Sequence, residues 1–129
     1  FNYRIHEADL DFLGHVNNAR YLEILEKARW DWIEKGGYGY DRMKQEQKGP
    51  VILEVVLKFK KELTLHTDVV IETFLPTLER LTSSVTQHIL SPDGATLYTT
   101  LDLKVGFFDL KTRRLIPPTA DWLKAINLS

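Results

Sequence analysis

The sequence predicts a single α+β domain, in which one long helix packs against an antiparallel sheet. Three observations lead to this fold class. The length of 129 residues fits one domain over residues 1–129. One segment in the first third of the chain has apolar residues at helical spacing, and most later segments alternate apolar and polar residues as strands do. Because helices and strands do not alternate along the chain, we do not expect a doubly wound parallel sheet.

The predicted helix begins near Asn17 or Asn18, since either residue can cap a helix, and ends at the glycine pair Gly36-Gly37. Apolar residues recur within it at intervals of four, three and four: Tyr21, Leu25, Ala28 and Trp32. About 18 residues at 1.5 Å each give a length of roughly 27 Å, so we expect this helix to be the central packing element.

Five strands are predicted around the helix. One precedes it, at residues 1–7, and four follow it, at residues 51–61, 68–75, 83–90 and 95–110. The first of the four is predicted from an alternation along the chain, in which Val55, Leu57 and Phe59 face one way and Val56, Lys58 and Lys60 the other. Residues 38–49 indicate a short helix or a lid, residues 111–114 a turn, and residues 117–126 a short terminal helix.

The composition excludes several classes of protein. The 17 basic and 18 acidic side chains give a net charge of −1, so no strong field exists to hold nucleic acid or an anionic membrane. The chain has no cysteine, which excludes a disulfide scaffold and a cysteine nucleophile, and its four histidines do not share a metal-ligand spacing. No apolar run approaches the ~20 residues of a membrane helix and no secretory leader is visible, so we expect no membrane insertion and a cytoplasmic location.

A polar loop that runs into the predicted helix carries the candidate chemistry. It reads Asp11-Phe12-Leu13-Gly14-His15-Val16-Asn17-Asn18, and so places a carboxylate, an imidazole and two amides just before the helix N-terminus. That end of a helix has unpaired N–H groups and a partial positive charge, so it can hold an oxyanion. A carboxylate beside such a site is suited to attack on a carbonyl, directly or through a water molecule. The alternative is an ordinary capped helix after a polar loop.

The same loop carries a resemblance to a known family. The run from Asp11 to Leu22, followed by Glu26-Lys27-Ala28-Arg29-Trp30-Asp31-Trp32, resembles the signature of hotdog-fold thioesterases of the 4-hydroxybenzoyl-CoA thioesterase type. The closest resemblance is to the bacterial long-chain acyl-CoA thioesterase III group. It implies a hotdog fold, with one long helix wrapped by a five- or six-stranded antiparallel sheet, and hydrolysis of medium- to long-chain fatty acyl-CoA to free acid and CoA. It also implies a homodimer whose sheets join edge to edge, or a tetramer of two dimers, with the active site at the dimer interface and no metal or cofactor.

The resemblance also implies roles for individual residues. Asp11 matches the family's catalytic aspartate, described either as the nucleophile or as the general base for water. Asn18 falls where a backbone N–H at the helix start polarises the thioester carbonyl. His15 matches the His-Val-Asn-Asn form of the motif, although Leu13 stands where the plant acyl-carrier-protein thioesterases have a further Asn, so His15 is expected to act directly or to orient other groups. Three more residues of the motif are expected to contact the substrate: Gly14, Asn17 and Tyr21.

Charged residues outside the motif are further candidates. Glu54 lies inside an apolar strand, so it either points into a cleft or sits on a solvated face. Lys60 and Lys61 end that strand and are candidates to contact the phosphates of CoA. Asp9 could compete with Asp11 as the working carboxylate, but we expect it to brace the loop.

Two other functions remain open at this point. The hotdog fold also hosts 2-enoyl-CoA hydratases and dehydratases, in which an aspartate and a histidine work together, usually in a differently built loop. A non-catalytic acyl-CoA-binding protein has no need of a carboxylate beside a carbonyl, and Asp11 therefore favours an enzyme. The sequence does not distinguish CoA thioesters from acyl-carrier-protein thioesters.

Overall fold

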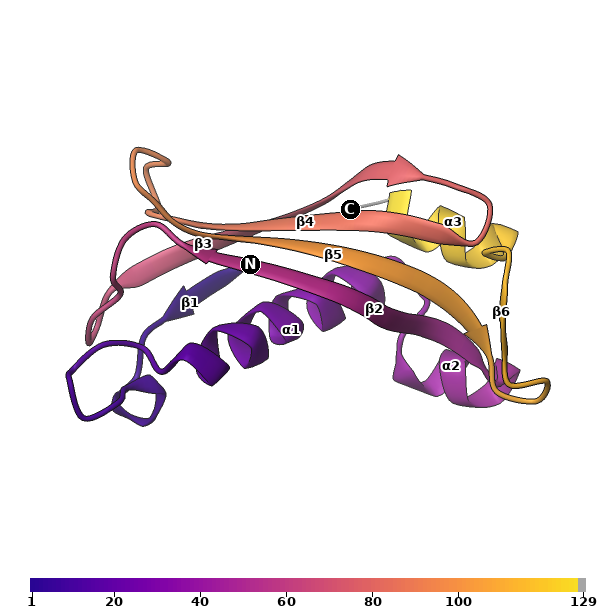
Figure 1. Cartoon of the computed structure of the whole chain (residues 1–129), viewed down its shortest axis with the longest axis horizontal. Coiled ribbons are helices and arrows are strands. Elements are labelled where there is room, and N and C mark those ends of the chain that lie inside the picture. The colour runs from indigo at the N-terminus through magenta and orange to yellow at the C-terminus, as the bar shows by residue number, and fades with distance from the viewer. Residues whose placement is uncertain (128–129) are drawn as a thin grey trace.

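Six antiparallel strands form one curved sheet that wraps around a long helix (Figure 1). The computed structural model describes residues 1–127. The strands are β1 (Asn2–Arg4), β2 (Lys48–Phe59), β3 (Asp68–Leu78), β4 (Thr82–Leu90), β5 (Leu97–Asp109) and β6 (Arg114–Ile116). Their hydrogen-bonded order is β1-β3-β4-β5-β2, with β6 paired to β5. The predicted α+β class, with one long helix wrapped by a five- or six-stranded antiparallel sheet, is confirmed, and the sheet has six strands.

The central helix α1 (Asn18–Lys35) has the 18 residues that the sequence predicts. It ends where α3 (Ala120–Asn127) crosses it, and a Cβ at Gly36 would lie 2.1 Å from the carbonyl oxygen of Ala125. Only glycine allows that approach. A short helix α2 (Tyr40–Glu46) fills the segment predicted as a helix or lid.

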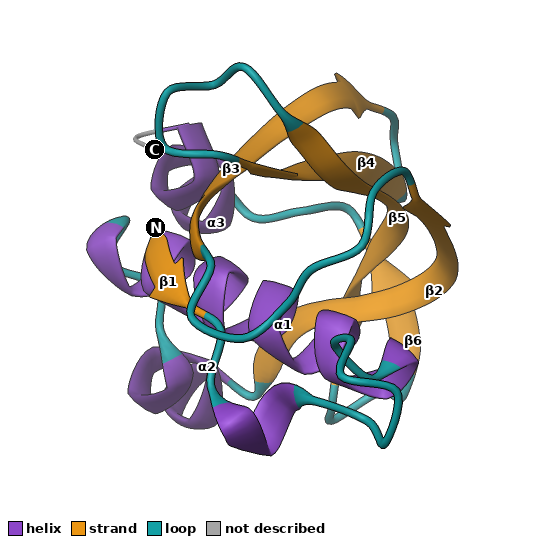
Figure 2. Ribbon diagram, turned by 90° about the vertical axis from the view of Figure 1, so that its left-hand side faces the viewer, coloured by secondary structure: helices purple, strands orange, loops and turns teal. Residues whose placement is uncertain are grey.

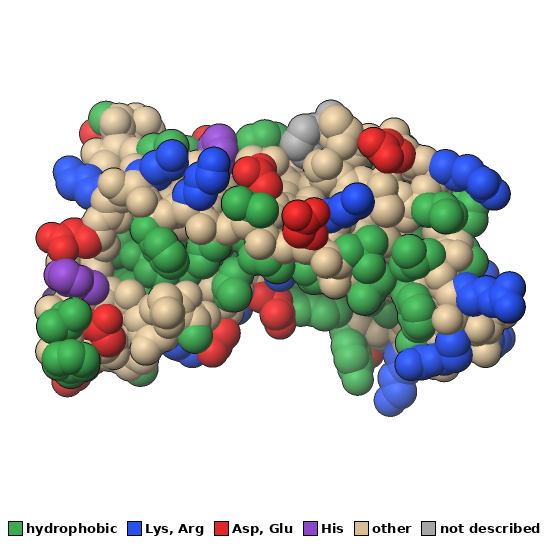
Figure 3. Space-filling view, in the orientation of Figure 1, with side chains coloured by type: hydrophobic (Ala, Val, Ile, Leu, Met, Phe, Trp, Pro, Cys, Tyr) green, Lys and Arg blue, Asp and Glu red, His purple; other side chains and the backbone are tan. Residues whose placement is uncertain are grey.

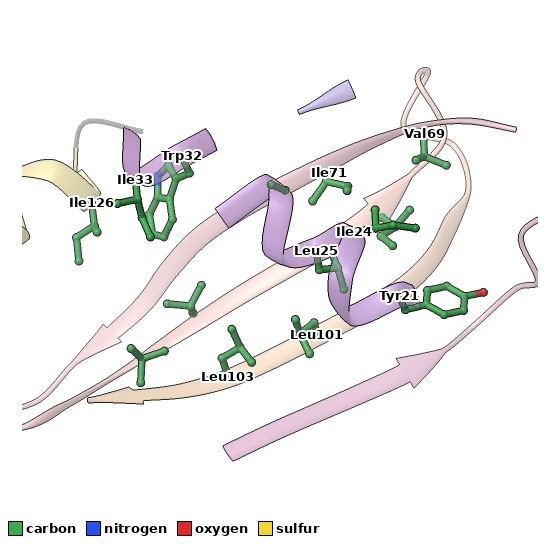
Figure 4. Packing of buried hydrophobic residues seen from close by; sticks show 14 of the residues in the cluster. Tyr21, Ile24, Leu25, Trp32, Ile33, Val69, Ile71, Leu101, Leu103 and Ile126 are labelled. Atoms are coloured by element: carbon green, nitrogen blue, oxygen red, sulfur yellow. The ribbon is translucent and has the colours of Figure 1, made fainter. Parts of the chain in front are cut away.

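The core lies between α1 and the concave face of the sheet, which curls around one side of the helix (Figure 2). All four apolar residues predicted to face the sheet are buried: Tyr21, Leu25, Ala28 and Trp32. Alternate residues of β5 meet them from the sheet, among them Leu101 and Leu103 (Figure 4). The packing therefore follows the helical and strand periods of the sequence.

Two segments differ from their prediction. Of the segment predicted as a strand at residues 1–7, only Asn2–Arg4 forms a strand, β1. A 3-10 turn η1 (Glu7–Asp9) follows, because the His6 N–H donates to the carboxylate of Asp9 at 2.9 Å and turns the chain. The predicted turn at residues 111–114 leads into a strand, β6, that the sequence did not predict. Three residues are too few to show an alternating pattern, and β6 exists because it pairs with the end of β5 beyond the reach of β4.

The edge strand β2 is exposed on both of its faces. It pairs only with β5, and a bulge at Leu53 shifts its register. Val55, Val56 and Phe59 are 44%, 41% and 56% exposed, so side chains on both faces of the strand meet solvent. Within residues 1–127 no further strand pairs with this edge, so its apolar side chains stay exposed in the single chain.

Candidate active site

The Asp11 loop joins η1 to α1 and is closed by its own hydrogen bonds. Leu10 and Val16 form an antiparallel bridge, and the Asp11 N–H donates to the His15 carbonyl oxygen at 2.8 Å. The Gly14 N–H donates to the Asp11 carbonyl oxygen at 3.1 Å, which makes a tight turn, and Gly14 has a φ of +82° that glycine adopts without strain. The loop is therefore a small rigid hairpin with Asp11 at its base.

The carboxylate of Asp11 is held by the same hairpin. Its Oδ1 accepts hydrogen bonds from the Leu13 N–H at 2.9 Å and from the His15 N–H at 3.3 Å. No hydrogen bond among residues 1–127 uses its Oδ2. One carboxylate oxygen is thus fixed by the loop, and the other is available to a substrate or a water molecule.

The start of α1 provides a hydrogen-bond donor. Asn17 is the N-cap, and its side-chain oxygen accepts from the Ala19 N–H at 2.9 Å, while its carbonyl oxygen accepts from the Arg20 N–H at 2.9 Å. Within the described chain, the N–H of Asn18, the first helical residue, has no such acceptor. The helix dipole adds a partial positive charge at this position, so the Asn18 N–H is suited to hold an oxyanion.

A hollow of about 580 Å³ brings the candidate residues together. Seven of the predicted site residues line this hollow: Asp11, His15, Asn17, Asn18, Tyr21, Lys60 and Lys61. Gly14 lies in the adjoining turn. The side chain of Asn17 serves as the helix cap, so its role in binding a substrate stays a prediction. The left-hand end of the molecule in Figure 3 shows this region, with histidine and acidic side chains beside hydrophobic ones.

Glu54 does not belong to this hollow. It lines a different one, also about 580 Å³, together with Thr77, Glu79 and Asp102. Within one chain it is therefore separated from the Asp11 loop, and its predicted contact with the substrate has no support from the fold of the single chain.

The imidazole of His15 pairs with a residue that sequence reasoning missed. Its Nε2 lies 2.8 Å from Oε2 of Glu62, and only the backbone N–H of His15 contacts the Asp11 carboxylate. The pairing arises because His15 forms an isolated antiparallel bridge with Thr64, which places Glu62 alongside. The only signal in the sequence is that Glu62 follows Lys60 and Lys61. An aspartate and histidine acting as one pair, as a hydratase would need, is not the arrangement here.

Asp9 braces the loop, as predicted. It is fully buried and accepts hydrogen bonds from the Tyr3 hydroxyl, the His6 N–H and two nitrogens of Arg20 at 2.7–3.1 Å. Burial alone would raise the pKa of Asp9, but the hydrogen bonds from His6, Arg20 and Tyr3 bring that pKa below its usual value. Burial and the contact with Asp9 raise the pKa of Tyr3 to about 12. Asp9 is thus an ionised structural anchor, and Asp11 is the carboxylate open to a substrate.

An aromatic pair and two lysines complete the hollow. The ring of Tyr21 packs edge to face against Phe59, with ring centroids 4.9 Å apart. Burial raises the pKa of Tyr21, so its phenol stays protonated at neutral pH. The N–H groups of Lys60 and Lys61 both donate to the Tyr98 carbonyl oxygen, at 2.8 and 3.0 Å, and their exposed side chains place positive charge at the rim.

The part of the chain that the structure describes lacks the features of a metal site and of a membrane helix. Among residues 1–127, no three His, Asp or Glu side chains gather as metal ligands would. Of the helices in the same residues, none combines the length and the apolar character that a membrane crossing requires.

Comparison with known proteins identifies the family. A profile described as the thioesterase-like superfamily matches residues 5–126, nearly the whole chain. The chain belongs to the thioesterase-like superfamily. The resemblance of the Asp11 loop to hotdog-fold thioesterases is thereby confirmed, and the fold around it is the hotdog fold.

Individual proteins are similar to this chain in sequence or in fold. The chain is 32% identical over 110 residues to the long-chain acyl-CoA thioesterase FadM of Escherichia coli strain K12, covering 83% of this chain and 80% of FadM. Among solved structures, the probable thioesterase YbaW of Escherichia coli has a TM-score of 0.86 and 25% identity over 98% of this chain and 96% of its own. A Staphylococcus aureus protein solved in complex with CoA has a TM-score of 0.90 at 16% identity, over 99% of this chain and 80% of its own.

Proposed function

We propose that this chain hydrolyses acyl-CoA thioesters to a carboxylic acid and free CoA, with medium- to long-chain fatty acyl-CoA as the substrate class. One observation carries the activity: the Asp11 carboxylate, with one free oxygen, lines the same hollow as the unpaired N–H of Asn18 at the start of α1. The relative at 32% identity is named a long-chain acyl-CoA thioesterase, which supports the substrate class.

In the proposed mechanism Asp11 is the general base. It takes a proton from a water molecule as the water oxygen bonds to the carbonyl carbon of the thioester. The carbonyl oxygen becomes an oxyanion, which accepts a hydrogen bond from the Asn18 N–H and is stabilised by the helix dipole. When the intermediate collapses, the C–S bond breaks and the proton on Asp11 passes to the departing CoA sulfur. The hydrogen bonds from Leu13 and His15 keep the carboxylate in place throughout.

A single turnover in ¹⁸O-labelled water tests the role of Asp11 as a base. Direct attack of water puts the label into the released acid and leaves the Asp11 carboxylate unlabelled. Attack by Asp11 itself would form an anhydride, and label recovered in the peptide that contains Asp11 would contradict the general-base route.

The positive rim of the hollow supports CoA as the leaving group. The exposed ammonium groups of Lys60 and Lys61 stand at the end of β2, beside the Asp11 loop. Lysine is a common partner of phosphate groups, and CoA carries several. The solved structural neighbour in complex with CoA has the same fold.

The proposed active form is a homodimer joined through β2. The strand is 12 residues long, has one unpaired edge and exposes apolar side chains on both faces. An unpaired strand edge of this kind can form hydrogen bonds with a second strand. When two copies of the same edge strand pair about a two-fold axis, they run antiparallel. Phe12, next to Asp11, is 95% exposed in the single chain, so the hollow also lacks a cover on that side. Pairing of two dimers into a tetramer stays a prediction.

Thiol release from a panel of acyl-CoA substrates tests the proposed activity. Because the protein has no cysteine, it adds no background to a thiol reagent. Release of CoA supports hydrolysis and identifies the preferred chain length. Hydration of an enoyl-CoA without CoA release would show that the protein is a lyase. Binding of the acyl-CoA panel without turnover would show that it is a non-catalytic binding protein.

A further inference from the structure

A second cavity lies at the opposite end of α1 from the Asp11 loop, and the mechanism above does not use it. Its volume is about 610 Å³, within the roughly 300–1,000 Å³ of ligand pockets in proteins. It lies where α2 packs near the start of β2 and the end of β5. Apolar and aromatic residues line most of it, among them Trp30, Tyr40, Met43, Val51, Phe108 and Leu110. We call this cavity the α2 pocket.

The chemistry of the α2 pocket suits an aliphatic chain. In Figure 3, hydrophobic side chains gather toward the α2 end of the molecule, with lysine and arginine side chains around them. Lys44 and Arg113 are exposed, so they stand at the mouth of the pocket. Gly49 keeps the interior open, because a Cβ there would lie 3.1 Å from Sδ of Met43.

A second hollow leads from the α2 pocket along β2. A smaller hollow of about 190 Å³ shares Trp30, Met43 and Pro50 with the α2 pocket and reaches Ile52. Ile52 is 41% exposed and belongs to the edge that the proposed dimer covers. The α2 pocket therefore extends toward the proposed dimer interface.

Within one chain the α2 pocket is far from the thioester site. Phe59 borders the Asp11 hollow and Val51 lines the pocket, and eight residues of extended strand separate them by roughly 26 Å. Along α1, Asn18 and Trp30 are separated by about 18 Å of helix.

The symmetry of the proposed dimer removes this separation. The exposed apolar residues of β2 run from Ile52 to Phe59, so a two-fold axis that buries them passes near Val55. Antiparallel pairing about that point places Phe59 beside the first residues of the second β2, one strand spacing of about 4.8 Å away. The nearest α2 pocket to each Asp11 is then the one in the partner subunit.

We propose that the α2 pocket of one subunit holds the distal part of the fatty acyl chain whose thioester is bound at the Asp11 loop of the other, and that Met43 and Trp30 determine the accepted chain length. This inference rests on the proposed function and its dimer. Each methylene that enters the pocket raises kcat/KM by at most about fourfold, which is the gain from burying one CH₂.

Filling the pocket tests the inference. Met43→Trp places a larger side chain inside it, and Gln45→Trp, an exposed position on the same helix outside the lining, is the matched control. The kcat/KM ratio of palmitoyl-CoA to butanoyl-CoA is expected to fall by about tenfold or more in Met43→Trp and to stay at the wild-type value in Gln45→Trp. An unchanged ratio in Met43→Trp overturns the inference and leaves the thioesterase activity intact. Absence of CoA release by the wild-type protein with every substrate would instead overturn the proposed function.

A heterodimer tests which subunit supplies the pocket. The heterodimer pairs an Asp11→Asn subunit with a differently tagged Met43→Trp subunit. If Asp11 and the α2 pocket of one site come from different subunits, one of its two sites combines an intact Asp11 with an open pocket. If both come from the same subunit, neither site does. In the first case, activity of the purified heterodimer on palmitoyl-CoA is expected to reach about half of the wild-type dimer. A heterodimer with no more than about half of the palmitoyl-CoA activity of the Met43→Trp homodimer would overturn the inference.

Discussion

The side chain of Asn17 accepts a hydrogen bond from the Ala19 N–H at 2.9 Å, and this cap passes over the N–H of Asn18 between them. The helix is therefore capped without using its first donor. Asn18 adjoins a hollow that also contains the Asp11 carboxylate. The stability of α1 and the proposed oxyanion site thus depend on different N–H groups, so they can be separated by mutation.

Asn18→Pro removes that donor with little strain. Proline is favoured at the first position of a helix, and Asn17 already has the extended ψ of 138° that a residue before proline prefers. We expect the variant to fold, with kcat lowered by about 10²–10³-fold. Asn18→Ala keeps the N–H and is expected to retain most activity. Equal kcat values for the two variants, with circular dichroism confirming the fold, would show that the N–H does not hold the oxyanion.

His15→Ala is expected to lower kcat by less than about tenfold. The backbone N–H of His15, which the substitution leaves in place, contacts Asp11, and the imidazole pairs with Glu62 at the surface. Steady-state kinetics of the variant and of Glu62→Gln measure this. A loss as large as that of Asp11→Asn would mean that the imidazole takes part directly in the chemistry.

Asp9→Asn is expected to lower the free energy of unfolding by about 2–4 kcal/mol, because Arg20 loses its buried partner. The pKa of Asp9 is lower in the folded chain than in the unfolded chain, so its ionised form stabilises the fold above about pH 4 and this contribution is lost as the pH falls through the folded pKa. Urea titrations between pH 2 and 6 are expected to show a weaker acid dependence in Asp9→Asn than in the wild type. Identical pH dependence would exclude Asp9 as an ionised anchor.

Val55→Glu is expected to separate the proposed dimer. It places charge at the centre of the exposed β2 edge, whereas Leu78→Glu changes a residue of similar exposure, 48%, on β3. Sedimentation equilibrium is expected to give one 15.0 kDa chain for the first variant and an oligomer for the wild type and the control. A wild-type protein that sediments as a monomer would contradict the dimer.

The sequence predicts what local periodicity determines. The spacing from Tyr21 to Trp32 defines α1, and the polar run from Asp11 to Asn18 locates the loop that the structure places at the hollow. Features that depend on contacts distant in sequence were missed. The pair of His15 and Glu62 depends on a bridge to Thr64, and β6 depends on the unpaired end of β5.

The position of Glu54 illustrates the same limit. Its strand was predicted, but the hollow it lines depends on the register between β2 and β5, which a bulge at Leu53 shifts. A one-residue change in register moves a side chain to the other face of a sheet. No pattern of single residues along the chain reports such a shift.

CoA release by Asp11→Asn tests the central claim most directly, with Asp93→Asn, an exposed turn position, as the matched control. The amide keeps the size of the side chain but cannot take a proton from water. We expect kcat on the preferred acyl-CoA to fall by about 10²–10⁴-fold in Asp11→Asn and to stay at the wild-type value in Asp93→Asn, with both variants folded. A folded Asp11→Asn protein that releases CoA at the wild-type rate would contradict the account.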